Sequence, residues 1–208
     1  MWLAILITVL AGYLLGNLNG SVCISALVAH DDVRSHGSGN AGLTNFIRNY
    51  GVSSALFVIL IDAGKATIAC LVGGLILAPH GYWLEGLTLG GLSVMLGHDF
   101  PALLGFKGGK GILSGLFIAL AVDWRVALII LAVFAAVYFT TRYVSLGSVL
   151  AGTAFGISFV VFHNDNPYVM VCGLVMAALT IFMHRSNIVR LIKGEERKTD
   201  LFKKGTKQ

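Results

Sequence analysis

Residues 52–78 read VSSALFVILIDAGKATIACLVGGLILA, and this stretch is apolar almost throughout. A helix needs about 20 predominantly apolar residues to cross the hydrocarbon core of a bilayer, so the stretch is long enough to span a membrane. Its charged residues are Asp62 and Lys65, which are three positions apart and therefore share one helix face. Charged groups inside a membrane usually face the bundle and pair. The stretch thus predicts a transmembrane helix that carries a structural salt bridge.

The composition of the whole chain agrees with a membrane protein. Hydrophobic residues make up 56% of the 208 residues and charged residues 12%, whereas soluble domains carry about 25% charged residues. The 26 glycines favour the close helix packing that is common in lipid. This composition excludes a disordered chain, a secreted disulfide scaffold and an ordinary cytosolic enzyme.

Six further apolar runs extend the pattern along the chain. They cover residues 2–29, 83–104, 111–122, 126–139, 145–162 and 167–183. The runs 111–122 and 126–139 are short, and Asp123-Trp124-Arg125 between them is typical of an interfacial turn rather than of one long kinked helix. We therefore expect a single all-α domain over residues 1–208, a polytopic membrane helix bundle of seven transmembrane helices, two of them short.

The distribution of positive charge predicts the orientation of this bundle. With seven spans, the loops that carry Arg34, Arg48, Lys107, Lys110 and Arg142 lie on the same side as the tail at residues 185–208, which holds eight of the fifteen lysines and arginines. The positive-inside rule then places the N-terminus outside and the basic tail in the cytoplasm. A five-helix alternative would separate these loops. No aromatic-interleaved basic stripe exists elsewhere, so we expect membrane lipid and no nucleic acid as a partner.

The first polar segment on this side has the composition of a ligand-binding loop. It reads RSHGSGNAGLTNFIR over residues 34–48. Its glycines, Gly39 among them, allow close approach to a ligand, and a helix starting near Leu43 would add free backbone amides for an anion. Arg48 supplies a fork suited to phosphate, and neutral polar groups come from Ser38, Asn40, Thr44 and Asn45. A flexible linker is the alternative, but the close spacing of these groups favours a ligand site.

The second polar segment, GFKGGKG at residues 105–111, places glycines between two lysines. Backbone amides and ammonium groups in such a loop can surround a phosphate, which makes Lys107, Gly108, Gly109 and Lys110 candidate binding residues. The segment is not a Walker A loop, because Gly111 replaces the required Ser/Thr. By itself it is equally compatible with a basic interfacial loop.

The third and fourth segments read RYVSLG at residues 142–147 and HRSNIVRLIKGEE at residues 184–196. His184 and Asn187 are three positions apart, so on a continuing helix they would point toward a common ligand. A lone interfacial histidine is more often a capping group than a catalyst, and its candidacy depends on the other loops meeting it here. His98, near the second segment, fits a structural and a supporting role equally well.

In this order the segments resemble the motifs of the PlsY family, the acyl-phosphate-dependent glycerol-3-phosphate acyltransferases of bacterial membranes. Residues 37–45 with Arg48 resemble the first motif, GHDFP at 97–101 leading to FKGGKG at 106–111 the second, and HxxNIxR at 184–190 followed by GEE at 194–196 the third. The resemblance runs the length of the chain, and the three motifs together are highly specific. One departure is Ile-Leu-Ser at residues 112–114, where the family more often has Val-Ala-Thr.

The resemblance implies transfer of a fatty acyl group from acyl phosphate to the sn-1 hydroxyl of glycerol 3-phosphate, giving lysophosphatidic acid and inorganic phosphate. It also implies a multi-pass protein of the bacterial plasma (inner) membrane with its active site on the cytoplasmic face. Ser38 and Arg48 match residues essential for activity, and the lysine loop matches the glycerol 3-phosphate site. The remaining matches are Thr44 and Asn45 at phosphate-binding positions, Ser145, His184 and Asn187 at further active-site positions, and Glu196 at a structural position.

The expected mechanism follows partly from what the sequence lacks. Many glycerolipid acyltransferases carry His-x-x-x-x-Asp, and no such spacing occurs in this chain. Because an acyl phosphate is already activated, the protein need mainly position its substrates and neutralise charge. We therefore expect a phosphate oxygen of the donor to take the hydroxyl proton, with Ser38 as a covalent nucleophile the less favoured alternative.

Other classes of function fit the sequence less well. A small membrane transporter for an organic phosphate would need polar groups along a path across the bilayer, and only Asp62 and Lys65 lie deep in the predicted spans. A lipid phosphatase or a CDP-alcohol transferase would need motifs that are missing from the sequence. We expect no metal, no cofactor and a monomeric protein.

Overall fold

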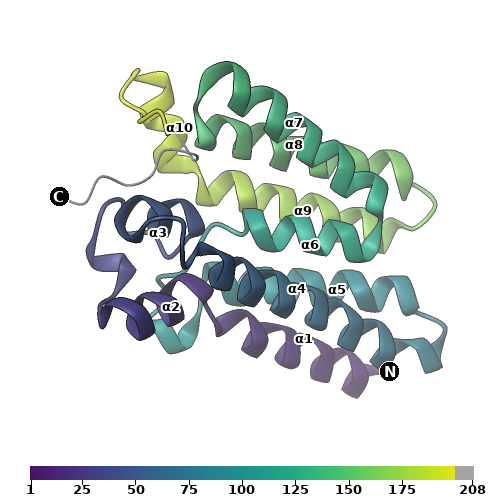
Figure 1. Ribbon diagram of the computed structural model, residues 1–208. Helices are drawn as coiled ribbons and strands as arrows, with labels where there is room; N and C mark the ends of the chain where they lie inside the picture. Colours follow the sequence, from purple (N-terminus) through teal and green to yellow (C-terminus); the bar gives the residue numbers. More distant parts are fainter. Residues whose placement is uncertain (200–208) are drawn as a thin grey trace.

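The computed structural model describes residues 1–199, which form α-helices joined by turns and by two longer loops, residues 30–42 and 100–111 (Figure 1). The helices are α1 (Trp2–Asn17), α2 (Gly20–Ala29), α3 (Leu43–Tyr50), α4 (Ala55–Leu77), α5 (Trp83–Asp99), α6 (Ile112–Val122), α7 (Trp124–Thr141), α8 (Val144–Phe162), α9 (Pro167–Met183) and α10 (Arg185–Ile192). Short 3₁₀ turns lie at Val33–Ser35, Ala78–His80 and Ala102–Leu104. The all-α prediction is confirmed. Of the predicted basic tail, residues 200–208 lie outside the described residues.

The lengths of these helices are those of a multi-pass membrane protein. Five helical stretches have the length and hydropathy of a full span: Trp2–Ala29, Ala55–His80, Trp83–Leu104, Trp124–Thr141 and Val144–Phe162. α9 and α10 together have the length and hydropathy of a full span, but a bend of 55° separates them. α6 is apolar but too short to be counted as a full span. The helix expected at 126–139 is longer than predicted, because Asp123 caps α7 by accepting a hydrogen bond from the Arg125 N–H at 2.9 Å. The total of seven spans stays a prediction.

The first apolar run is broken between α1 and α2. Asp62 and Lys65, both on α4, form hydrogen bonds with the backbone groups that the break leaves unpaired. Lys65 Nζ donates to the carbonyl oxygens of Leu18 at 2.6 Å and Gly16 at 3.3 Å, which have lost their helical partners. Asp62 Oδ1 accepts from the Gly20 N–H at 3.1 Å and lies 2.9 Å from Lys65 Nζ. A backbone break inside a membrane requires such internal partners. The predicted structural salt bridge is therefore present.

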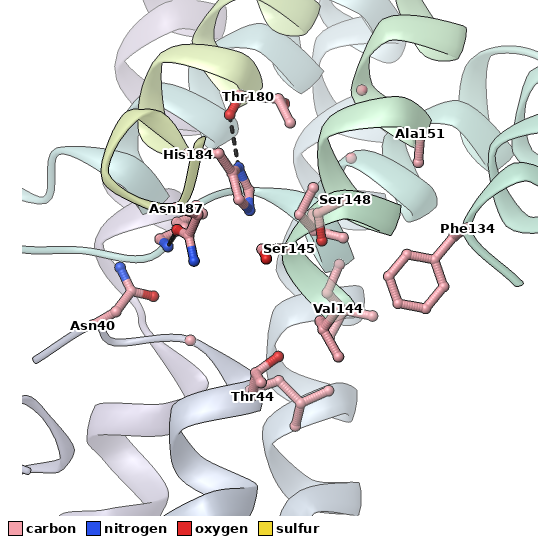
Figure 2. Close-up of a pocket in the computed structure, with 18 of the residues that line it drawn as sticks. Asn40, Thr44, Phe134, Val144, Ser145, Ser148, Ala151, Thr180, His184 and Asn187 are labelled. Carbon is pink, nitrogen blue, oxygen red and sulfur yellow. Dashed lines mark hydrogen bonds between the residues drawn. The ribbon is translucent and has the colours of Figure 1, made fainter. Parts of the chain in front are cut away.

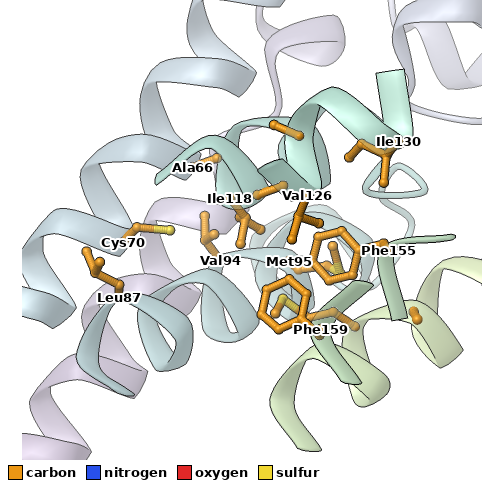
Figure 3. Packing of buried hydrophobic residues seen from close by; sticks show 14 of the residues in the cluster. Ala66, Cys70, Leu87, Val94, Met95, Ile118, Val126, Ile130, Phe155 and Phe159 are labelled. Carbon is orange, nitrogen blue, oxygen red and sulfur yellow. The ribbon is translucent and has the colours of Figure 1, made fainter. Parts of the chain in front are cut away.

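The helices form two layers with α6 between them (Figure 1). α1, α4 and α5 pack on one another, α8 packs between α7 and α9, and α6 contacts α4, α5, α7 and α8. Close approach of α4 to α5 depends on glycine, since a Cβ on Gly73 would overlap the carbonyl oxygen of Gly86. Figure 3 shows the apolar side chains buried between the layers, which include Cys70, Val94, Ile118, Val126, Phe155 and Phe159.

The polar segments gather at one end of this bundle. α2, α3 and α10 lie at that end, and the N-terminus of α1 lies at the other (Figure 1). The basic residues Arg48, Lys110 and Arg190 line a common cavity there. The predicted convergence of the loops is thus confirmed, and the placement of this end in the cytoplasm stays a prediction.

Candidate active site

The first polar loop is shaped by the buried side chain of Asn45, on the first turn of α3. Its Nδ2 donates to the carbonyl oxygens of Val33, His36 and Asn40 at 2.9, 3.1 and 3.0 Å. Its Oδ1 accepts from the backbone N–H of Ser38 at 3.0 Å. The Asn45 amide therefore holds the loop that presents Ser38, and Asn45 also lines the cavity described below.

The lysine loop packs directly on the end of α5. The Gly109 N–H donates to the carbonyl oxygen of His98 at 3.0 Å, and a Cβ on Gly109 would overlap the His98 imidazole. The Gly108 carbonyl oxygen accepts from Asn40 Nδ2 and from the Ala41 N–H, both at 3.3 Å. The two glycines thus fix this loop against both α5 and the first loop.

As a result the two lysines of this loop have different positions. The side chain of Lys107 is exposed and does not line the cavity. Lys110 lines the cavity, and its Nζ donates to Asn187 Oδ1. Asn187 Nδ2 donates in turn to Glu196 Oε1 at 2.9 Å, and Glu196 Oε2 accepts from Arg190 Nε at 2.7 Å. This chain of contacts orients Asn187 and Lys110, which agrees with the structural role expected for Glu196.

Glu196 stays ionised in this setting. Burial opposes its charge, but hydrogen bonds from Asn187 and Arg190 outweigh burial and hold the pKa of the Glu196 carboxyl below its ordinary value. Ser145, on the first turn of α8, lines the same cavity as Glu196. The negative charge of Glu196 partly offsets the arginines and the lysine around it.

His184 lies where α9 bends into α10. Its Nδ1 is 2.8 Å from the carbonyl oxygen of Thr180 (Figure 2), and a carbonyl oxygen can only accept, so we assign the hydrogen to Nδ1. In the neutral ring Nε2 then has a free lone pair. Figure 2 shows Asn40, Thr44, Ser145, His184 and Asn187 around one common space.

These residues line a cavity of about 370 Å³. Its polar end is formed by Ser38, Asn40, Thr44, Arg48, Lys110, Ser145, His184 and Asn187. Its other walls are mainly apolar and include Met95, Leu116, Ile130, Phe134, Ala151 and Phe155, with Asp62 and His98 among the further polar residues. A second cavity of about 210 Å³ shares Ser38, Asn40, Lys110 and Arg190 with the first and adds Gly39 and Arg185. The arrangement suits a molecule with an anionic head and an apolar tail.

Five polar residues of the cavity wall lie outside the predicted set of site residues. Two of them, Asp62 and His98, were expected in structural or supporting roles, and three others lie near a predicted residue. Each of these three is one helical turn from a residue that was predicted, and this spacing could have identified it. They are Ser148 after Ser145, Thr180 before His184 and Arg190 after Asn187.

Comparison with known proteins identifies the family. A family model described as glycerol-3-phosphate acyltransferase matches residues 6–194. A solved structure of PlsY (YgiH), an integral membrane glycerol 3-phosphate acyltransferase in its glycerol 3-phosphate form, superimposes with a TM-score of 0.83 at 34% identity and covers 96% of this chain and 99% of that one. The chain belongs to the PlsY family.

Further PlsY relatives agree along nearly the whole chain. The lysophosphatidic acid form of the same protein superimposes with a TM-score of 0.80, covering 95% of this chain and 96% of that one. The glycerol-3-phosphate acyltransferase of Thermoanaerobacter sp. (strain X514) is 36% identical over 192 residues, 92% of this chain and 94% of the relative. That of Finegoldia magna is 38% identical over 197 residues, 95% of this chain and 97% of the relative. The family resemblance of the sequence motifs is confirmed.

The position of Lys110 predicts a pH dependence for this PlsY-family protein. Burial, together with the positive charge of Arg190, lowers the pKa of the Lys110 ammonium to about 8, so it is charged below that pH and neutral above it. A phosphate monoester stays dianionic over this range, because its second pKa is about 6. We expect kcat/KM for glycerol 3-phosphate, which reports the free enzyme, to fall about tenfold per pH unit above pH 8.

The Lys110→Arg variant, in which the charge persists at all these pH values, serves as the control. Its kcat/KM profile should lose the alkaline fall even if its absolute activity is lower. A wild-type profile that stays level to pH 9.5 would contradict a charged Lys110 as the binding group.

Proposed function

We propose that this protein transfers a fatty acyl group from acyl phosphate to the sn-1 hydroxyl of glycerol 3-phosphate, at the cytoplasmic face of the bacterial plasma membrane. The observation that carries the proposal is that one and the same cavity has a cationic end, with Arg48 and Lys110, and an apolar part. An acyl phosphate has the same division into a charged and an apolar part. The smaller cavity, with Arg185 and Arg190, offers room for a second phosphate.

The reaction needs one bond to form and one to break. The sn-1 hydroxyl oxygen attacks the acyl carbonyl carbon, and the bond from that carbon to the phosphate oxygen breaks. The products are lysophosphatidic acid and inorganic phosphate. Arg48 and Lys110 hold the two phosphates and neutralise the charge that develops on the leaving oxygen, while Ser38 and the first turn of α3 donate to it. No metal or cofactor takes part in these steps.

The hydroxyl proton passes to an oxygen of the departing phosphate in this proposal. Among the protein groups, His184 is the alternative acceptor for the hydroxyl proton. Its Nδ1, however, donates to the Thr180 carbonyl and not to a carboxylate. It therefore lacks the partner that stabilises an imidazolium in a His–carboxylate pair. His184 instead accepts a hydrogen bond through Nε2 and helps orient the hydroxyl. Trapping a radiolabelled acyl-enzyme from acyl phosphate alone would overturn this route in favour of Ser38 as nucleophile.

The proposed function is tested by the choice of acyl donor. We expect the purified protein to release phosphate from palmitoyl phosphate only when glycerol 3-phosphate is present, with lysophosphatidic acid formed in equal amount. Palmitoyl-CoA and palmitoyl-acyl carrier protein should give no product, because their leaving groups cannot take the place of a phosphate between Arg48 and Lys110. Product from the thioesters alone would reject the donor assignment.

The apolar part of the cavity predicts how chain length is selected. Ala151 is buried on α8 and lines the cavity, so Ala151→Phe would fill space that an acyl tail needs. We expect kcat/KM to fall about tenfold more for palmitoyl phosphate than for octanoyl phosphate. Ala132→Phe, on the exposed face of α7, is the matched control and should leave both values near wild type. Equal losses for the two donors would place the tail elsewhere.

A further inference from the structure

Residues 195–199, which we name the C-terminal strap, run from α10 to the end of α7. The Thr199 N–H donates to the carbonyl oxygen of Arg142 at 3.0 Å, and the Tyr138 hydroxyl donates to the carbonyl oxygen of Thr199 at 3.2 Å. Lys198 Nζ lies 5.5 Å from the centre of the Tyr143 ring. The strap is therefore attached at both its ends, by Glu196 to α10 and by Thr199 to α7.

Thr199 also connects the strap to the opposite wall of the cavity. Nη2 of Arg48 donates to Thr199 Oγ1. Arg48 lies on α3, which packs mainly on α2 and α4, whereas Arg142 ends α7 in the other layer. With 7% of its surface exposed, Thr199 is enclosed by these groups. The strap thus bridges the two layers beside the cavity, which Arg48 and Glu196 line, and Arg48 is its contact on the α3 side.

This contact bears on how Arg48 meets a ligand. A guanidinium group has five N–H donors, and one of them is occupied by Thr199. Within residues 1–199 Arg48 makes no second side-chain hydrogen bond, so its other donors are available to the cavity that it lines. A long side chain that is already held in place loses less rotamer freedom when a ligand binds, which strengthens binding. A hydroxyl is well suited to this task because it does not neutralise the arginine.

We propose that Thr199 is a positioning residue, whose hydroxyl holds the Arg48 guanidinium in the orientation that binds a substrate phosphate. The proposal rests on the proposed function, in which Arg48 contacts a phosphate. Thr199 lies beyond residues 6–194, to which the family model matches. Within the strap, Glu196 matches the third family motif, whereas Thr199 lies outside the three motifs.

The test compares Thr199→Val, which keeps the shape of the side chain without its hydroxyl, with Thr199→Ser, which keeps the hydroxyl. We expect Thr199→Val to lower kcat/KM for acyl transfer about tenfold, mainly through KM, and Thr199→Ser to stay within about twofold of wild type. The matched control is Thr140→Val, because the Thr140 hydroxyl donates only to carbonyls of its own helix, at 2.8 and 3.1 Å. In an Arg48→Lys background, Thr199→Val should cause no further loss.

Two results would overturn the proposal. One is that Thr199→Val and Thr199→Ser lower kcat/KM equally, or that Thr199→Val lowers kcat/KM as much in the Arg48→Lys background as in the wild type. Either outcome indicates that Thr199 acts on folding alone. The other is wild-type kinetics in Thr199→Val. The affinity for inorganic phosphate, measured by calorimetry, tests the positioning of Arg48 without turnover. We expect this affinity to be about tenfold weaker in Thr199→Val than in the wild type. A wild-type protein that binds phosphate but transfers no acyl group would refute the proposed function while leaving this test valid.

Discussion

Replacing Arg48 with lysine is expected to lower kcat/KM for acyl transfer by about 100-fold or more, although the positive charge is kept. The guanidinium of Arg48 donates to Thr199 through Nη2 and lines the cavity with its remaining donors. A lysine ammonium is a shorter group with a single nitrogen, so it cannot contact the strap and a phosphate along two parallel hydrogen bonds. The loss should affect both substrates, because the transition state spreads charge over the phosphate being released.

Phosphate release from palmitoyl phosphate, measured on detergent-purified protein with glycerol 3-phosphate varied, gives the required constants. Arg142→Lys is the matched control, because Arg142 is an exposed arginine at the same end of the bundle and uses its backbone carbonyl, not its guanidinium, to bind the strap. It should retain near-normal turnover. Near-normal turnover in Arg48→Lys would remove Arg48 from the phosphate site.

The second large effect is expected at Lys110. Lys110→Met should raise KM for glycerol 3-phosphate about 100-fold, because it removes a cation from the cavity wall and leaves the Asn187 Oδ1 without its donor. Methionine keeps most of the length of the lysine side chain, so the packing of the loop against His98 should survive. Circular dichroism and the thermal midpoint of the variant verify that the fold is intact.

Lys107→Met is the matched control from the same loop. Because the Lys107 side chain is exposed and outside the cavity, its removal should change KM by no more than about threefold, through long-range charge alone. Similar losses in the two variants would mean that the loop binds its ligand with both lysines, as the sequence motif by itself suggests. A large increase in KM confined to Lys107→Met would mean that Lys107, and not Lys110, binds the substrate.

Much of the fold and part of the site could be predicted from the sequence, because both depend on short-range patterns. Apolar runs of sufficient length predict helices, and the three-residue spacing of His184 and Asn187 predicts a common face, as the cavity confirms. The alternation of loops predicts that Arg48 and Lys110 meet at one end of the bundle. Each of these predictions uses only the periodicity of a helix or the thickness of a bilayer.

Other features depend on packing between distant segments, which a single sequence does not reveal. Lys110 points inward and Lys107 outward because Gly108 and Gly109 pack on the end of α5, a contact that the loop sequence does not indicate. From the motif alone, Asn45 and Ser38 are equally good candidates for binding a ligand. In the structure, the Asn45 amide donates to three backbone carbonyl oxygens. The contact of Thr199 with Arg48 joins residues far apart in the chain, and no spacing rule predicts it.

The break between α1 and α2 has a consequence for the order of membrane insertion. The first run leaves the ribosome before α4, so the carbonyls of Gly16 and Leu18 enter the bilayer before Lys65 can reach them. Unpaired carbonyls in lipid are strongly unfavourable, so we expect the break between α1 and α2 to form only once α4 lies beside the first run. We therefore expect the end of the bundle that carries the polar segments to be completed only after α4 has inserted.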